Sequence, residues 1–130
     1  MTISDHSNIL LIMITGIDNQ FNEAEKAIFN RFPKLFRQAN LSMQESCMYW
    51  GIECPLCWFS VIEKLAEDIN EIAPDCVEFA QIKEKWYELR VYVDFLDGAT
   101  DDIVKKVYSL IDEAERQCFI LDEERNGKIN

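Results

Sequence analysis

The sequence predicts an α+β domain in which helices pack on a small antiparallel β-hairpin or sheet, in the order helix, helix, hairpin, helix. Three observations favour this fold class. Apolar residues recur every three or four positions as far as Ile72, which is the period of an amphipathic helix. After Pro74 they alternate with polar residues, which is the period of a strand, and after residues 97–100 the helical period returns. Segregated helical and strand segments are typical of α+β domains.

The first twenty residues carry little secondary-structure signal. Residues 1–7 are polar and are expected to form a disordered tail. The apolar run at residues 8–15 predicts a short buried element, which periodicity alone cannot assign to helix or strand. This run is far below the ~20 residues needed to cross a bilayer, so we expect no membrane-spanning segment.

Two helices are predicted between residues 22 and 74. The first begins at Asn22 and is interrupted by Pro33, after which another turn or two is expected to end near Asn40. The second is clearer, because its apolar residues form one stripe that ends at Pro74. The stripe consists of Trp58, Val61, Ile62, Leu65, Ile69 and Ile72.

The hairpin and the last helix follow. Residues 77–82 and 89–95 alternate as strands, with Gln81 on the face of Phe79, and residues 83–87 are the expected connection. Thr100 is a plausible N-cap for the last helix. Residues 122–130 are expected to be loose, and the whole chain, 1–130, to be one domain. The buried side of the last helix is Ile103, Val107, Leu110, Ile111, Ala114, Cys118 and Leu121.

The net charge of −11 is unevenly distributed along the chain. Residues 1–52 contain five acidic and four basic side chains, whereas residues 53–130 contain nineteen acidic and nine basic ones. Such a field repels nucleic acid and anionic membranes and attracts basic partners. We therefore expect neither direct nucleic-acid binding nor membrane binding.

The motif "CPLCW" is the stretch that most suggests chemistry. Cys54 and Cys57 have the spacing of half a zinc site or of a redox dithiol. The only histidine is His6, and neither a second cysteine pair nor a βαβ context accompanies the motif. We expect no metal and no cofactor, and interpret the pair as buried or turn residues before the second helix. The odd total of five cysteines, without a signal-peptide pattern, favours reduced thiols in a cytosol.

Catalytic patterns are also missing from the sequence. A serine or cysteine nucleophile needs a nearby base, and the single imidazole lies in the expected tail. No glycine-rich phosphate loop is present, and the abundant carboxylates do not form a recognisable pair. We therefore predict that the protein is not an enzyme.

Acidic residues on the last two helices are the main candidates for a binding surface. Glu63, Glu67 and Glu71 follow one another at four-residue spacing, which destabilises an isolated helix by a few tenths of a kcal/mol per pair. Such an array could imitate the closely spaced phosphates of DNA, or only keep the protein soluble. The predicted partner-binding residues are Glu63, Glu67, Asp68, Glu71, Asp112, Glu113 and Glu115.

A second candidate patch lies around the hairpin. It combines basic and aromatic side chains, which can stack on bases or form a protein hot spot. Acidic residues interrupt it, namely Glu84, Glu88 and Asp94. The alternative binding patch consists of Lys83, Lys85, Trp86, Tyr87 and Arg90.

Several segments resemble those of a group of small, uncharacterised phage and prophage proteins. They are "FPKLF", "CMYWGIECPLCWFSVIEKLAEDI", "QIKEKWYELRVYVDF" and "IDEAERQ", which together extend over about residues 32–118. The family motifs are Trp-Gly-x-Glu-x4-Trp and Gln-(Val/Ile)-Lys-Glu-Lys-(Phe/Trp)-x-x-Leu-Arg-x-Tyr. The matching residues are Met48, Trp50, Gly51, Glu53, Trp58, Gln81, Lys83, Glu84, Lys85, Leu89, Arg90 and Tyr92.

This chain departs from the family pattern at three places. It has Pro55, Leu56 and Cys57 where the family has Gly-Asp-Gly, and Trp86 with Tyr87 where the family has Phe-Gly. It also lacks the family's terminal cysteine knuckle, so the metal site that the resemblance implies there is not expected. The resemblance implies a phage setting and no particular activity.

Together these features predict a non-enzymatic, acidic, phage-encoded binding protein of the host bacterial cytoplasm. It would inhibit a host defence nucleoprotein, as an anti-CRISPR or similar anti-defence protein whose acidic surface could imitate DNA. The expected partner is a host protein or nucleoprotein complex with a basic surface. An immunity protein against a basic toxin and a small nucleic-acid-binding accessory protein remain alternatives.

Overall fold

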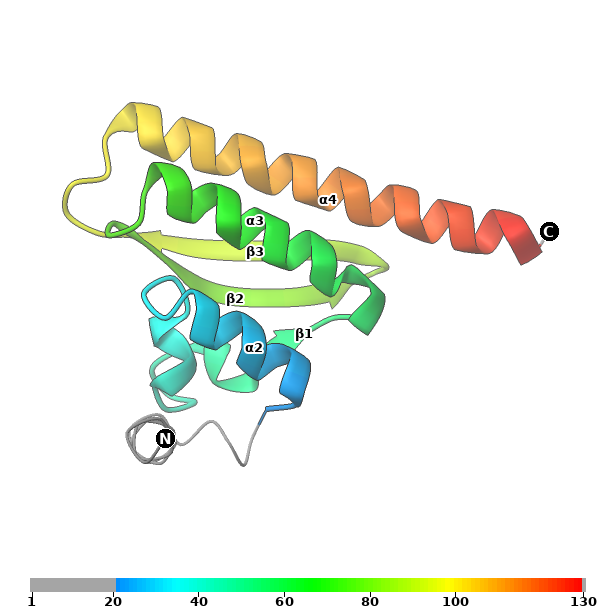
Figure 1. The fold of residues 1–130 in the computed structure, drawn as a ribbon, viewed down its shortest axis with the longest axis horizontal. Helices are drawn as coiled ribbons and strands as arrows, with labels where there is room; N and C mark the ends of the chain where they lie inside the picture. The colour runs from blue at the N-terminus through cyan, green and yellow to red at the C-terminus, as the bar shows by residue number, and fades with distance from the viewer. Residues whose placement is uncertain (1–20, 130) are drawn as a thin grey trace, which may run out of the picture.

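The structure, a computed structural model, describes residues 21–129 and the side chains of residues 21–124. Within these residues it contains three α-helices and a three-stranded sheet, so the α+β class and the order helix, helix, hairpin, helix are confirmed (Figure 1). The expected tail at residues 1–7, with His6, and the apolar run at residues 8–15 lie outside the described residues.

The elements have the following bounds. The α-helices are α2 (Glu23–Arg31), α3 (Phe59–Ile72) and α4 (Asp101–Ile129), and the strands are β1 (Ile52–Glu53), β2 (Val77–Lys85) and β3 (Glu88–Phe95). Three short 3-10 helices connect them, η2 (Arg37–Asn40), η3 (Cys47–Trp50) and η4 (Leu56–Trp58). Helices α3 and α4 pack against each other along the hairpin, and α4 continues past the hairpin turn (Figure 1). That residues 122–130 are loosely held stays a prediction.

Reciprocal hydrogen bonds fix the start of α2 at the predicted position. The Glu25 backbone N–H donates to Asn22 Oδ1 at 2.8 Å, and the Asn22 backbone N–H donates to Glu25 Oε1 at 3.0 Å. This capping box satisfies two backbone donors that a helix terminus otherwise leaves unpaired. The second oxygen of Glu25 accepts from the Ile52 N–H at 2.8 Å, so the same carboxylate joins α2 to β1.

The predicted helical stripes form most of the core. On α3, Ile62, Leu65 and Ile69 are buried, whereas Ile72 is 37 % exposed and lies outside the core, contrary to the prediction. Ile72 is the last residue of the helix, in the same final turn as the exposed Glu71. All seven predicted residues of α4 are in the core or packed against it. The Thr100 hydroxyl accepts from the Ile103 N–H at 3.2 Å, as expected of an N-cap.

A β-bulge at Ala80 decides which residues of β2 face the core. The strand pairs with β3 in antiparallel register, but Ala80 has no partner between its two neighbours. The extra residue shifts the alternation by one, so Phe79 and Ile82 are both fully buried although three positions separate them. The prediction that Gln81 shares the face of Phe79 is wrong, because the bulge turns Gln81 to the opposite face beside Tyr92.

Strand β1 and the true hairpin turn are not predicted from the sequence. Strand β1 has only two residues, too few to show a period, and it adds a parallel edge to the sheet with Ile52 opposite Ile82. The predicted connection at residues 83–87 is too long, because β2 continues through Lys85 and β3 begins at Glu88. The turn is therefore Trp86 and Tyr87 alone, which lack the usual Asn-Gly signal of a two-residue turn.

A buried carboxylate anchors η2 to the sheet. The Glu78 side chain is 6 % exposed and accepts a hydrogen bond from Arg37 Nη2 at 2.9 Å and another from Gln38 Nε2 at 3.1 Å. These charge-assisted contacts satisfy an acid that would otherwise be costly to bury. The guanidinium of Arg37, followed by the amide of Gln38, holds the pKa of Glu78 below its usual value despite burial.

This lowered pKa predicts acid sensitivity of a defined sign. Because the folded state binds the proton of Glu78 less tightly than the unfolded state, the contribution of Glu78 is fully present above pH 4.5 and disappears as the pH falls through the folded pKa. We expect Glu78→Gln to reduce the free energy of unfolding at pH 7, and this reduction to shrink toward pH 3. Urea unfolding of both proteins at pH 7, 5 and 3 measures it. A difference that stays constant with pH would contradict the assignment.

Candidate functional site

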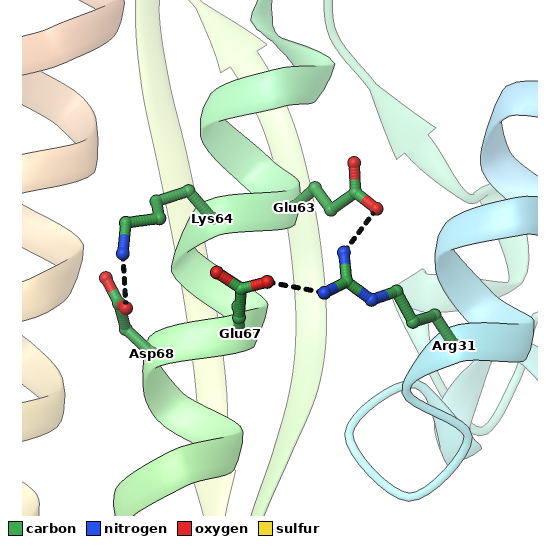
Figure 2. A network of polar contacts seen from close by, with 5 residues as sticks. All are labelled: Arg31, Glu63, Lys64, Glu67 and Asp68. Atoms are coloured by element: carbon green, nitrogen blue, oxygen red, sulfur yellow. Dashed lines mark hydrogen bonds and ion pairs between the residues drawn. The ribbon is translucent and has the colours of Figure 1, made fainter.

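Two of the seven predicted acidic residues face α2. Arg31, in the last turn of α2, donates from Nη1 to Glu63 Oε2 at 2.7 Å and from Nη2 to Glu67 Oε2 (Figure 2). These hydrogen bonds raise the pKa of Arg31, with Glu63 contributing most. The two glutamates are 41 % and 45 % exposed, and the guanidinium between them offsets their mutual repulsion. Their main contacts are therefore structural.

Two further predicted residues border a groove between α3 and α4. Asp68 accepts from Lys64 at 2.9 Å on the α3 side (Figure 2). Glu113 pairs with Arg116 and accepts from Gln117 at 2.8 Å on the α4 side. The groove has a volume of about 320 Å³. Apolar side chains between these polar borders line it, namely Val61, Leu65, Leu110 and Ala114.

The remaining predicted acidic residues lie at two other places. Glu71 is exposed in the last turn of α3. Asp112 and Glu115 line a cavity of about 510 Å³ between α4 and the start of β3, together with Glu88 and Arg90. Burial raises the pKa of Glu115, as does the charge of Asp112, whereas Arg90 lowers it. The seven residues thus form separate groups around α3 and α4 and do not form one continuous row.

The alternative patch is closer to neutral than its sequence suggests. Lys83 lies opposite Arg90 across the hairpin, and Lys85 lies opposite Glu88. Arg90 Nη2 forms an ion pair with Glu88 at 2.9 Å and also lies in the cavity that Glu115 lines. Each basic residue therefore has an acidic neighbour, since Lys83 also lies beside Glu53 in the sheet register. The patch lacks the uninterrupted positive charge that a nucleic-acid backbone requires.

Trp86 and Tyr87 differ from the rest of that patch. Both side chains are 79 % exposed, at the very end of the hairpin. Both backbones have positive φ angles, 57° and 68°, in the left-handed region that bulky residues rarely adopt. The sequence shows these two residue types but not their backbone conformation, because only the paired ends of the strands reveal a two-residue turn.

The residues of the CPLCW motif connect β1 to α3 and have structural contacts. Trp58 is fully buried, as the apolar stripe of the second helix predicts, and its Nε1–H donates to Asp122 Oδ1 at 3.1 Å. Burial raises the pKa of the Cys54 thiol to about 12, so it is protonated and weakly nucleophilic at neutral pH. The Cys57 side chain is exposed in η4. Among residues 21–129, no three His, Cys, Asp or Glu side chains group to hold a metal ion.

Comparison with protein-family models, with curated proteins and with solved structures finds no match to this chain. The resemblance to small phage proteins therefore stays a prediction from the motifs. In the part of the chain that the structure describes, no helix is both long and apolar enough to cross a bilayer.

Proposed function

We propose that this protein is a non-catalytic binding protein whose acidic α3–α4 layer occupies a basic surface of another macromolecule. The observation that carries the proposal is the charge of this layer. Residues 59–72 contain four acidic and one basic side chain, and residues 112–124 contain six acidic and one basic. Helices α3 and α4 lie side by side, so these charges add to one field (Figure 1).

The proposed partner is a host defence nucleoprotein, such as a CRISPR effector, with the protein encoded by a phage. A basic channel that binds nucleic acid is attracted to a surface that carries closely spaced negative charges. The phage setting rests on the resemblance of the motifs, and the partner class rests on charge complementarity. An inhibitor of this kind needs no catalytic group, and it acts in the bacterial cytoplasm by excluding nucleic acid from the channel.

Charge reversal at exposed acidic residues tests this function. Glu71→Lys combined with Asp112→Lys is expected to weaken binding at least tenfold and to reduce its salt dependence, because long-range attraction to a basic surface is electrostatic. These positions avoid the Arg31 ion pairs, whose loss would disturb the packing of α2 on α3. The affinity for a partner captured from host lysate is measured at 50 mM and 200 mM salt.

A matched control changes the same net charge elsewhere. Glu23→Lys combined with Asp97→Lys reverses two exposed acidic residues outside the α3–α4 layer. If the layer forms the interface, this control keeps most of the affinity. Equal weakening by both double variants would show that only the total charge matters, and an unchanged affinity and salt slope in the first variant would exclude the layer as the binding surface.

A further inference from the structure

Strands β2 and β3 are joined by the shortest connection that an antiparallel hairpin commonly uses. Lys85 and Glu88 form the last pair of the ladder, so Trp86 and Tyr87, here named the hairpin tip, make the whole turn. The right-handed twist of the strands requires positive φ at both positions of such a turn, which Asn-Gly adopts at least cost. The tip places two large aromatic residues there instead, at φ 57° and 68°.

The fold does not compensate this strain by packing. Each tip side chain is 79 % exposed, and within the described residues neither ring stacks on another aromatic ring. Leu89, two positions beyond the tip, is by contrast 2 % exposed. A residue choice that opposes both the backbone preference and the hydrophobic effect marks a position kept for function.

We propose that the hairpin tip is a preformed docking element that inserts its two aromatic rings among the lysine and arginine side chains of a basic protein partner. Tryptophan and tyrosine present large rigid surfaces at low entropic cost, and they dominate protein hot spots. Cations are attracted to the faces of their rings. This inference rests on the proposed function and assigns it a contact point at the end of the sheet, outside the α3–α4 layer.

The net charge of the chain favours a basic partner. Lys85 and Glu88 flank the tip directly, and the cavity behind it is lined by Glu88, Asp112 and Glu115 together with Arg90 and Arg116. The basic residues of the hairpin are matched by acidic neighbours, since Lys85 lies opposite Glu88 in the ladder. The hairpin itself is thus close to neutral, and the net charge of −11 of the whole chain repels a phosphate backbone and attracts the ammonium and guanidinium groups of a basic partner.

Replacing the tip by Asn-Gly separates binding from folding. Trp86→Asn combined with Tyr87→Gly gives the turn its preferred residues, so the Tm is expected to rise by about 5 °C or more. The net charge stays the same, so electrostatic attraction is unchanged. With a fluorescently labelled nona-arginine peptide as the probe, we expect the Kd of this variant to increase at least fivefold at 50 mM salt. Trp86→Phe combined with Tyr87→Phe retains both rings and is expected to retain most of the affinity.

The possible outcomes decide the proposal. An unchanged Kd together with a raised Tm overturns it, because the tip would then contribute strain without binding. A tip-dependent mobility shift with single-stranded DNA, or tip-dependent self-association in sedimentation, also overturns it and assigns the tip to nucleic acid or to a second copy. If only the double variant Glu71→Lys with Asp112→Lys loses affinity, the proposed function stands without the tip. Loss only in the tip variant supports the tip and rejects the layer.

Discussion

Replacing Trp58 by alanine is expected to lower the free energy of unfolding by about 3–5 kcal/mol. The Trp58 ring is fully buried where η4 passes into α3, and its indole N–H donates to Asp122 on α4. Removing it leaves a cavity between the start of α3 and α4 and takes one hydrogen-bond donor from the carboxylate. Since domains of this size are stable by about 5–15 kcal/mol, the loss is a large part of the total.

Urea unfolding followed by far-UV circular dichroism measures this loss. The matched control is Trp50→Ala, because the Trp50 ring is 55 % exposed and forms a T-shaped contact with Tyr49 at a centroid distance of 5.0 Å. We expect the control to lower the free energy of unfolding by about 1 kcal/mol or less. Equal losses at the two tryptophans would show that Trp58 does not anchor α3.

The spacing of apolar residues was sufficient to predict the long helices α3 and α4, because each buries one continuous stripe of apolar side chains. On α4, residues spaced by three and four positions from Val107 to Cys118 enter the core, as the pattern indicates. Within β2 the period does not predict which side chains are buried, because one inserted residue at Ala80 reverses the faces of the residues that follow. A bulge has no sequence period, so only the pairing with β3 reveals it.

The candidate site was predicted less completely than the fold, because its interactions join distant residues. Glu63 and Glu67 form a repulsive pair when α3 is considered alone, and only the packing of α2 brings Arg31 between them. Likewise, the hairpin patch contains an excess of basic residues in sequence, but strand register places Glu88 opposite Lys85. The sequence therefore identifies the candidate charged residues, but it does not predict the net charge around each of them in the fold.

Gly51 is a motif residue whose requirement for glycine is explained only by the three-dimensional structure. It lies directly before β1 with φ 77° and ψ −152°, a region that is essentially restricted to glycine. A Cβ atom placed on it would lie 2.3 Å from Glu25 Oε2 and 2.8 Å from Phe21 Cε1. Both neighbours are buried, and the Glu25 carboxylate accepts backbone hydrogen bonds from both Asn22 and Ile52. The methyl group would have to displace this carboxylate.

Gly51→Ala is accordingly expected to lower the free energy of unfolding by about 3–5 kcal/mol. The unfavourable backbone conformation contributes about 1–3 kcal/mol, and the loss of buried hydrogen bonds to Glu25 contributes a similar amount. Gly98→Ala is the matched control, because Gly98 also has a positive φ, 99°, but its nearest atom would be Cys76 Cβ at 4.0 Å. We expect the control to show the backbone penalty alone.

The difference in free energy of unfolding between the two glycine variants measures the contribution of the Glu25 carboxylate, which joins α2 to β1. If Glu25 holds these elements together, Gly51→Ala should also speed amide hydrogen exchange at Glu25 and Ile52, whose N–H groups are hydrogen-bonded at the cap and at the start of β1. Gly98→Ala should leave those two amides protected. Equal destabilisation by the two variants, with both amides still protected, would mean that the backbone angle alone requires glycine at position 51.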